Sequence, residues 1–223
     1  MRKYWKRNYT IMVIMAVVVV AVALFLAQKE EVLAAPQTLI ASFPTYLEVR
    51  RALQEIVAED NGGFGFNMWA TIVDRNGVVK LVTASGDRTG DQWPGSRLIS
   101  AQKANTANAF SLPGFALSTA NLFTATQPGG SLFGLQVSNP VNTVVAYGGD
   151  ASGYGTENDP MVGGKIGGVN VFGGGLALYN ANGTLIGGIG VSGDSSCADH
   201  NIAWRLRHRL NLDNVPAGVG SAP

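Results

Sequence analysis

The sequence is poor in the residues that catalytic and metal centres most often require. Its 223 residues include one cysteine, Cys197, and two histidines, and only 14% of them are charged. A single cysteine excludes an intrachain disulfide, and a lipid-modified N-terminus is excluded because no cysteine follows the hydrophobic N-terminal segment. The motifs of serine hydrolases, zinc proteases, dithiol enzymes and phosphate-binding loops are absent as well. Enzymatic activity therefore has little support in the sequence.

The chain also lacks the basic excess that nucleic-acid binding requires. The first 35 residues hold five of the 16 basic and two of the 15 acidic residues, so the rest has a formal net charge of −2. That charge argues against a nucleic-acid partner. With 46% hydrophobic residues, the chain is long enough for one well-buried core, and we expect a single globular domain.

One long hydrophobic run stands at the N-terminus. Residues 11–27 contain neither charge nor proline and follow four basic residues between positions 2 and 7. This pattern predicts an export signal and places the later residues outside the cytoplasm. A 17-residue run agrees with both a transmembrane anchor and a cleaved signal peptide, and Pro36, close behind the small residues at 32–34, favours the anchor. We expect an extracytoplasmic protein, periplasmic or at the cell surface, either membrane-tethered or secreted after cleavage.

The composition predicts four parts of the chain. They are a signal anchor or signal peptide at 1–35, a tether at 36–45, a folded domain at 46–212 and a C-terminal tail at 213–223.

Within the domain, the spacing of apolar residues predicts the elements. We expect an amphipathic helix from Tyr46 to Val57, a helix from Ser96 as its cap to Phe110, a short helix capped by Ser118 or Thr119, and a last helix from Asp194 or Ser195 to Leu210. The glycine-rich stretch 139–168 shows no lasting periodicity. We expect a long ordered loop there, with a strand at 143–147.

Two apolar hairpins resemble each other. Residues 66–73 and 78–83 flank the Asn76-Gly77 turn, and two apolar runs between Gly174 and Gly193 flank Asn182-Gly183. Hairpins separated by helices predict an α+β fold, an antiparallel sheet with helices packed on it, of the profilin or sensor-like kind. Glycines weaken the second hairpin, so we expect a close neighbour there: a packed helix, another subunit or a flat ligand.

The last helix gathers the chemistry-bearing residues on one face. At 100° per residue, Cys197, His200, Trp204 and His208 share a stripe opposite an apolar face that contains Ile202, Ala203, Leu206 and Leu210. Imidazole and thiolate can ligate iron or a soft metal, and an indole can stack on a porphyrin. Cys197 and His200 can share one ion, whereas His208 lies two turns from His200, about 12 Å away. A solvated or subunit-contacting face is the alternative.

A glycine motif precedes this helix. Residues 188–193 match G-x-G-x-x-G, but too few residues follow for the parallel strands of a dinucleotide-binding fold. The backbone amides from Gly193 to Ser196 can instead form a simpler site for a carboxylate or propionate.

Three segments together resemble one family. The hairpin from Gly174 to Gly193, the run Lys103-Ala104-Asn105-Thr106-Ala107, and Val73-Asp74 followed by Asn76-Gly77 are similar to motifs of the GlcG/HbpS family of haem-binding or haem-degrading proteins. The resemblance covers about 46–210. It implies the same α+β layout, haem as a ligand, a homo-oligomer, and a role for Lys103 and Thr106 in a pocket or an interface. The segment from Ser195 to His200 departs from the commoner family ending.

These observations lead to an exported protein that binds or sequesters haem. Two alternatives stay open: a non-catalytic sensory or small-ligand-binding domain, and a haem-degrading enzyme. Cys197 and His200 are also the candidate metal ligands. The candidate cofactor-binding residues are Cys197, His200, Trp204, Lys103, Thr106 and Gly193.

Overall fold

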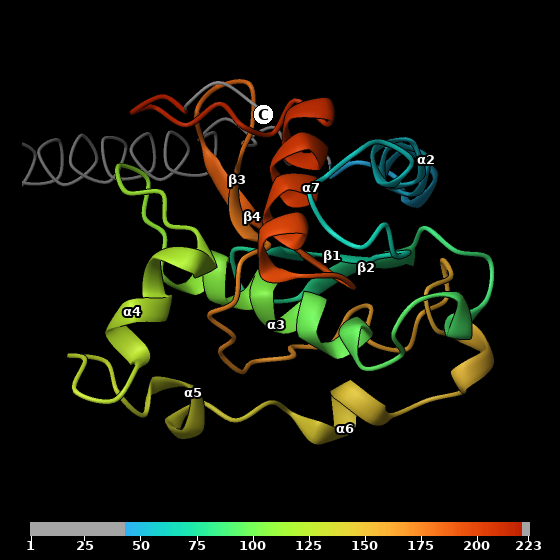
Figure 1. Ribbon diagram of the computed structural model, residues 1–223, viewed down its shortest axis with the longest axis horizontal. Helices are drawn as coiled ribbons and strands as arrows, with labels where there is room; N and C mark the ends of the chain where they lie inside the picture. Colours follow the sequence, from blue (N-terminus) through green and yellow to red (C-terminus); the bar gives the residue numbers. More distant parts are fainter. Residues whose placement is uncertain (1–42, 220–223) are drawn as a thin grey trace, which may run out of the picture. The chain divides into compact units, whose positions relative to one another are not determined.

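The computed structural model describes residues 43–219 (Figure 1). The predicted signal anchor, most of the predicted tether and the last four residues lie outside this range. Between residues 43 and 219, no helix has both the length and the hydropathy needed to cross a bilayer.

A four-stranded antiparallel sheet forms the centre of the domain, in the order β2-β1-β4-β3. The strands are β1 (Trp69–Asp74), β2 (Val79–Ala84), β3 (Gly175–Tyr179) and β4 (Leu185–Ser192). Gly77 and Gly183 have φ of 74° and 71°, the left-handed conformation that each tight turn needs. Both predicted hairpins are confirmed, and they join through the pairing of β1 with β4.

Helices cover both faces of the sheet and confirm the α+β class. Helix α3 (Ser96–Ala109) packs on one face, while α2 (Tyr46–Val57) and α7 (Ser196–Arg209) pack on the other (Figure 1). Short helices follow α3 along the chain: α4 (Phe123–Thr126), α5 (Leu135–Ser138) and α6 (Thr143–Tyr147). Within the described residues, 3₁₀ turns lie at Thr89–Asp91, Thr119–Leu122 and Ala151–Gly153.

Two local predictions are wrong. Residues 143–147 form helix α6 and not a strand, because the Asn142 side chain accepts hydrogen bonds from the amides of Val144 and Val145 and so caps a helical turn. Ser96 is the first residue of α3 and not its cap, since Gly95 holds the cap position without a side-chain hydrogen bond. Local capping decided the conformation of α6 against the β-branched composition of its residues.

The glycines of β4 allow α3 to approach the sheet. A Cβ atom at Gly190 would lie 1.9 Å from the carbonyl oxygen of Ser100, and one at Gly188 would lie 2.4 Å from that of Ala104. Both neighbours belong to α3, so the packed-helix explanation for these two glycines is confirmed. Helix α3 fills the space that a flat ligand would need there.

Candidate functional site

A buried ion pair holds the start of α7. The Lys103 Nζ donates to Asp199 Oδ2 at 2.6 Å and to the Val191 carbonyl at 3.0 Å, and only 1% of Lys103 is exposed. Asp199 Oδ1 accepts the backbone amides of Gly193 at 3.2 Å and Asp194 at 2.9 Å. Burial lowers the pKa of Lys103 and raises that of Asp199. Lys103 and Gly193 are therefore committed to contacts within the protein.

The amide site predicted at residues 193–196 is largely filled by the protein's own carboxylates. Besides the two amides bound by Asp199, the Ser195 amide donates to Asp194 Oδ1, and Asp194 also accepts the amides of Phe64 and Phe66. Three of the four amides of this stretch thus already have an acceptor.

Thr106 ties α3 to the segment before β3. Its Oγ1 donates to the Gln102 carbonyl at 2.7 Å and accepts the Asn170 amide at 3.0 Å, and the side chain is fully buried. Thr106 thus fixes the residues that lead into Val171 and Phe172.

The outer face of α7 carries three of the predicted residues. Ser195 caps the helix as predicted, accepting the Ala198 amide at 3.3 Å. Cys197 is exposed, His200 is half-buried, and the rings of His200 and Trp204 meet edge to face with centroids 6.1 Å apart. The core face of α7 is confirmed as well, since Ile202, Ala203 and Leu206 are buried.

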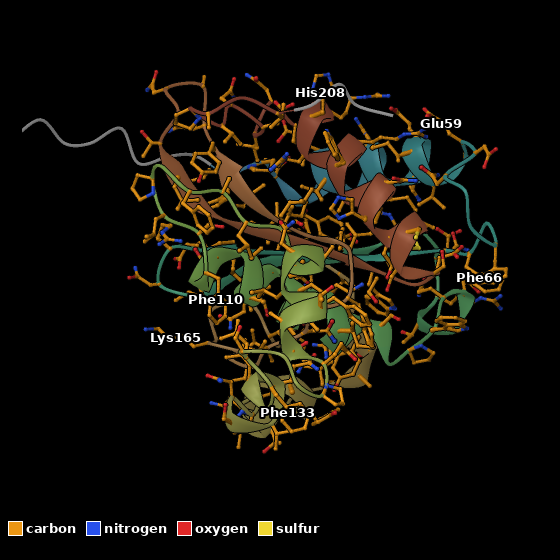
Figure 2. The ribbon with its side chains drawn as sticks, turned by 60° about the vertical axis from the view of Figure 1, so that its left-hand side comes forward. Glu59, Phe66, Phe110, Phe133, Lys165 and His208 are labelled. Carbon is orange, nitrogen blue, oxygen red and sulfur yellow. The ribbon has the colours of Figure 1, made fainter. Side chains whose placement is uncertain are left out.

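His208 belongs to a different environment, near the C-terminal end of α7 (Figure 2). Its side chain is 65% exposed, and its Nδ1 lies 2.7 Å from Asp213 Oδ2. Within the predicted stripe, the rings of His200 and Trp204 are in contact, whereas His208 contacts Asp213 instead.

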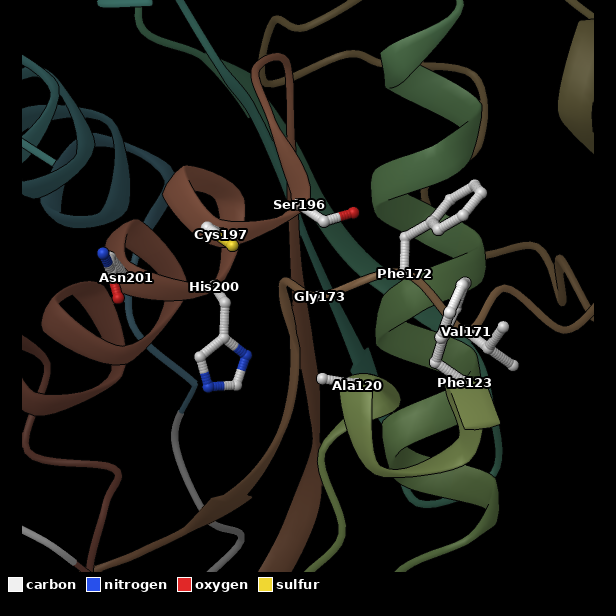
Figure 3. Close-up of a pocket in the computed structure, with 9 residues that line it drawn as sticks. All are labelled: Ala120, Phe123, Val171, Phe172, Gly173, Ser196, Cys197, His200 and Asn201. Carbon is white, nitrogen blue, oxygen red and sulfur yellow. The ribbon is translucent and has the colours of Figure 1, made fainter. Parts of the chain in front are cut away.

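A pocket of about 540 Å³ opens beside this face of α7. Its walls are Ala120, Phe123, Val171, Phe172, Gly173, Ser196, Cys197, His200 and Asn201 (Figure 3). Figure 3 shows His200 and Cys197 on one side and the rings of Phe123 and Phe172 on the other. These rings are 43% and 48% exposed, and their centroids lie 6.3 Å apart. The volume and the apolar walls are those of a small-molecule site.

Sequence reasoning missed this aromatic wall. Phe123 lies in α4 and Phe172 in the loop before β3, almost 50 residues apart in the sequence. Neither shows a motif or a periodicity, and only the tertiary fold brings them opposite α7.

A second pocket, of about 310 Å³, adjoins the first and shares His200 with it. Its lining is more polar and includes part of the C-terminal segment. The lining residues are Ala116, Leu117, Ser118, Asn121, Leu176, His200, Trp204, Arg207, Val215, Gly218 and Val219.

His200 lines both pockets and lies where they meet. Its Nδ1 is buried and has no hydrogen-bond partner among the described residues. Burial first, and then the charges of Arg207 and Lys103, lower the pKa of His200 below its ordinary value of 6.5. The imidazole is therefore neutral at pH 7, the form that can ligate a metal.

The larger pocket fits a haem by the chemistry of its walls. Residues 43–219 contain no cluster of three or more His, Cys, Asp or Glu side chains that could hold a free metal ion. A neutral imidazole and a thiol on an apolar, aromatic-walled pocket instead suit an iron that arrives with its own macrocycle. Among the walls of this pocket, Cys197 and His200 carry the side chains whose chemistry can ligate iron.

Comparisons with known proteins agree with this chemistry. The family model described as "Haem degrading protein HbpS-like" matches residues 45–206. A crystal structure of a PduOC–haem complex is 25% identical, with a TM-score of 0.55, and the match covers 79% of this chain and 99% of that one. The Klebsiella pneumoniae protein ORFY is 24% identical, with a TM-score of 0.50, over 75% of this chain and 90% of that one. The search of curated proteins found no match.

Proposed function

The chain belongs to the HbpS-like family, and from this premise we propose that it binds haem in the larger pocket beside α7. We call this the haem pocket, defined by Phe123, Phe172, Cys197 and His200. The observation that carries the proposal is a neutral imidazole with an unpartnered nitrogen on the wall of a pocket lined by half-exposed phenylalanines. The haem-bound PduOC structure supports this proposal, because its fold matches 79% of the present chain.

Each residue of the pocket has a physical role in this proposal. His200 or Cys197 would ligate the haem iron, and the rings of Phe123 and Phe172 would cover the apolar macrocycle and exclude water from it. Bound haem would supply an iron centre. Lys103, Asp199 and Gly193 hold the first turn of α7 in place, and Thr106 holds the loop that carries Phe172. These buried residues position the ligands and do not contact haem themselves.

We also propose that the protein is exported and forms a homo-oligomer. The hydrophobic run at 11–27 with its basic flank supports export. Exposed apolar side chains between residues 132 and 147 support self-association, since Phe133, Val137, Val144 and Tyr147 are each at least 67% exposed. Protease protection in spheroplasts and light scattering of the purified protein test the two statements.

A haem titration of the full-length protein, followed by absorbance, tests the main proposal. We expect saturable one-to-one binding with a shifted Soret band. His200→Ala should change the band position and weaken binding if His200 is the ligand, and Cys197→Ala should do so if the thiol is. His208→Ala is the matched control, because this second histidine of α7 lies outside the haem pocket.

A spectrum that stays that of free haem in wild type would contradict the proposal and leave the small-ligand alternative. Adding a reductant under air to the haem complex separates binding from degradation. Loss of the Soret band with release of iron, faster than in free haem, would establish the degrading activity that the family description names.

A further inference from the structure

The smaller pocket beside α7 contains an unusual concentration of unsatisfied polar atoms. We call it the arginine pocket, defined by His200, Trp204, Arg207, Ser118 and Asn121. Across the described residues, four buried side-chain nitrogen or oxygen atoms lack a hydrogen-bond partner, and three of them are His200 Nδ1, Trp204 Nε1 and Arg207 Nε. Buried polar groups normally have partners. Their concentration on one helix therefore needs an explanation.

The helix geometry brings the three side chains to one place. Positions 200, 204 and 207 are four and three residues apart, the spacing that aligns side chains along one face of a helix. All three residues line the same pocket. Two of the three orphan atoms are donors only, because an indole and a guanidinium have no acceptor. A ligand that satisfies them must supply acceptor oxygens.

The charge of Arg207 specifies the ligand further. Arg207 is 5% exposed, and its Nη1 donates to the Ala177 carbonyl at 3.1 Å. The ion pairs of the described residues do not include it, and the carboxylate of Asp213, the main opposing charge, lies 2.7 Å from His208. A buried cation that makes no direct ion pair is costly. An anionic ligand would remove that cost.

We propose that the arginine pocket binds a carboxylate group, which accepts hydrogen bonds from Trp204 and Arg207. A volume of about 310 Å³ suits a small molecule. Two sources share this chemistry. One is a free small organic acid, and the other is a propionate of haem in the adjoining pocket, since His200 lines both pockets. The first source is independent of the proposed haem binding, and the second rests on it.

Calorimetric titration of the haem-free protein with succinate tests the free-acid source. We expect saturable binding that Arg207→Gln weakens by about tenfold or more, because a charge-assisted hydrogen bond is lost. Trp204→Phe keeps the packing of the ring, removes the indole donor and should weaken binding a few-fold. Arg205→Gln is the matched control on the same helix, because Arg205 pairs with Glu59 outside this pocket. Succinate binding that Arg207→Gln and Trp204→Phe leave unchanged would contradict the free-acid source.

Titration with haem and with haem dimethyl ester tests the propionate source. The ester lacks free carboxylates, so wild type should bind haem at least several-fold more tightly, and Trp204→Phe and Arg207→Gln should reduce that preference. Ester binding with a shifted Soret band would support haem binding in the haem pocket, independently of any carboxylate binding in the arginine pocket. Succinate binding without any haem binding would support the arginine pocket alone. No succinate binding together with equal affinity for haem and its ester would overturn the carboxylate proposal.

Discussion

Two glycine-bearing regions of the molecule differ in whether their polar groups have hydrogen-bond partners and in how closely their backbones pack. Between β4 and α3, the backbones touch at Gly188 and Gly190, and the polar groups nearby have partners, such as Thr71 Oγ1 and Ser100 Oγ at 2.7 Å. Beside α7, Gly173 borders a pocket with half-exposed phenylalanines and an unpartnered histidine. In the sequence, both regions are alike in having glycines next to apolar residues. The polar groups at the helix–sheet contact are satisfied, whereas three unsatisfied groups lie on α7 beside the two pockets.

The largest expected effect on stability comes from removing one partner of the buried Lys103–Asp199 ion pair. Lys103→Met leaves the Asp199 carboxylate buried opposite a methionine, so we expect it to lower the free energy of unfolding by about 3–5 kcal/mol. Urea denaturation measures this change. Arg209→Met is the control, because the Arg209–Glu55 pair is more than half exposed on both sides and should contribute no more than about 1 kcal/mol.

A double variant sharpens the same comparison. Lys103→Met with Asp199→Asn removes the unpaired charge and keeps an oxygen that can accept the Gly193 and Asp194 amides. We expect it to be more stable than Lys103→Met alone. A double variant as unstable as the single one would show that Lys103 acts by packing and not by charge.

Disrupting the contact between Gly190 and α3 should lower the free energy of unfolding by a smaller amount. A methyl group at Gly190 would overlap the Ser100 carbonyl of α3, and overpacking of this kind typically costs about 1–3 kcal/mol, so we expect Gly190→Ala to fall at the upper end of that range. Thermal and urea unfolding measure the change. Gly114→Ala is the control, since its Cβ would meet no atom within 4 Å. Equal stability of the two variants would contradict the packing explanation.

The sequence predicted the local features of both regions better than their partners. Asn-Gly turns, the cap at Ser195 and the apolar face at Ile202 and Leu206 depend on neighbouring residues, and all were predictable. The family motif drew attention to Lys103 but did not reveal that its partner is Asp199, 96 residues away. No local pattern encodes a pairing over that distance.

The same limit applies to the candidate site. The stripe on α7 was predicted from helical spacing, which is local. Its aromatic wall at Phe123 and Phe172 and the burial of Arg207 depend on how distant segments pack. The orphan atoms at His200 and Trp204 become visible only once every possible partner has been placed.

Substitutions in the haem pocket beside α7 should change ligand affinity and leave the free energy of unfolding nearly unchanged. Phe172→Ala removes a ring that is 48% exposed, so we expect the free energy of unfolding to change by less than about 1 kcal/mol. Haem affinity should fall by about tenfold, since aromatic contacts carry much of the binding energy in such pockets. Phe115→Ala, at a side chain that is 57% exposed and outside the haem pocket, should leave affinity unchanged. Comparable losses in both variants would remove the haem pocket from its proposed place.

The smallest effect is a pH dependence centred on His200. Burial, followed by the charges of Arg207 and Lys103, lowers the pKa of His200 in the folded protein, whereas in the unfolded chain it titrates near 6.5. The folded protein therefore binds fewer protons than the unfolded chain just below pH 6.5, and stability falls as the pH drops through that window. His200→Gln should flatten this part of the stability curve.

The chain has only two histidines, so NMR can follow both imidazoles separately, with His208→Ala assigning the signals. We expect the His200 signal to titrate below 6.5, which would keep its imidazole neutral and able to bind iron in mildly acidic conditions. A His200 pKa at or above 6.5 would mean that burial does not disfavour the charged imidazole. The imidazole would then carry a proton in mildly acidic conditions, and the main physical argument for His200 as the ligand would be lost.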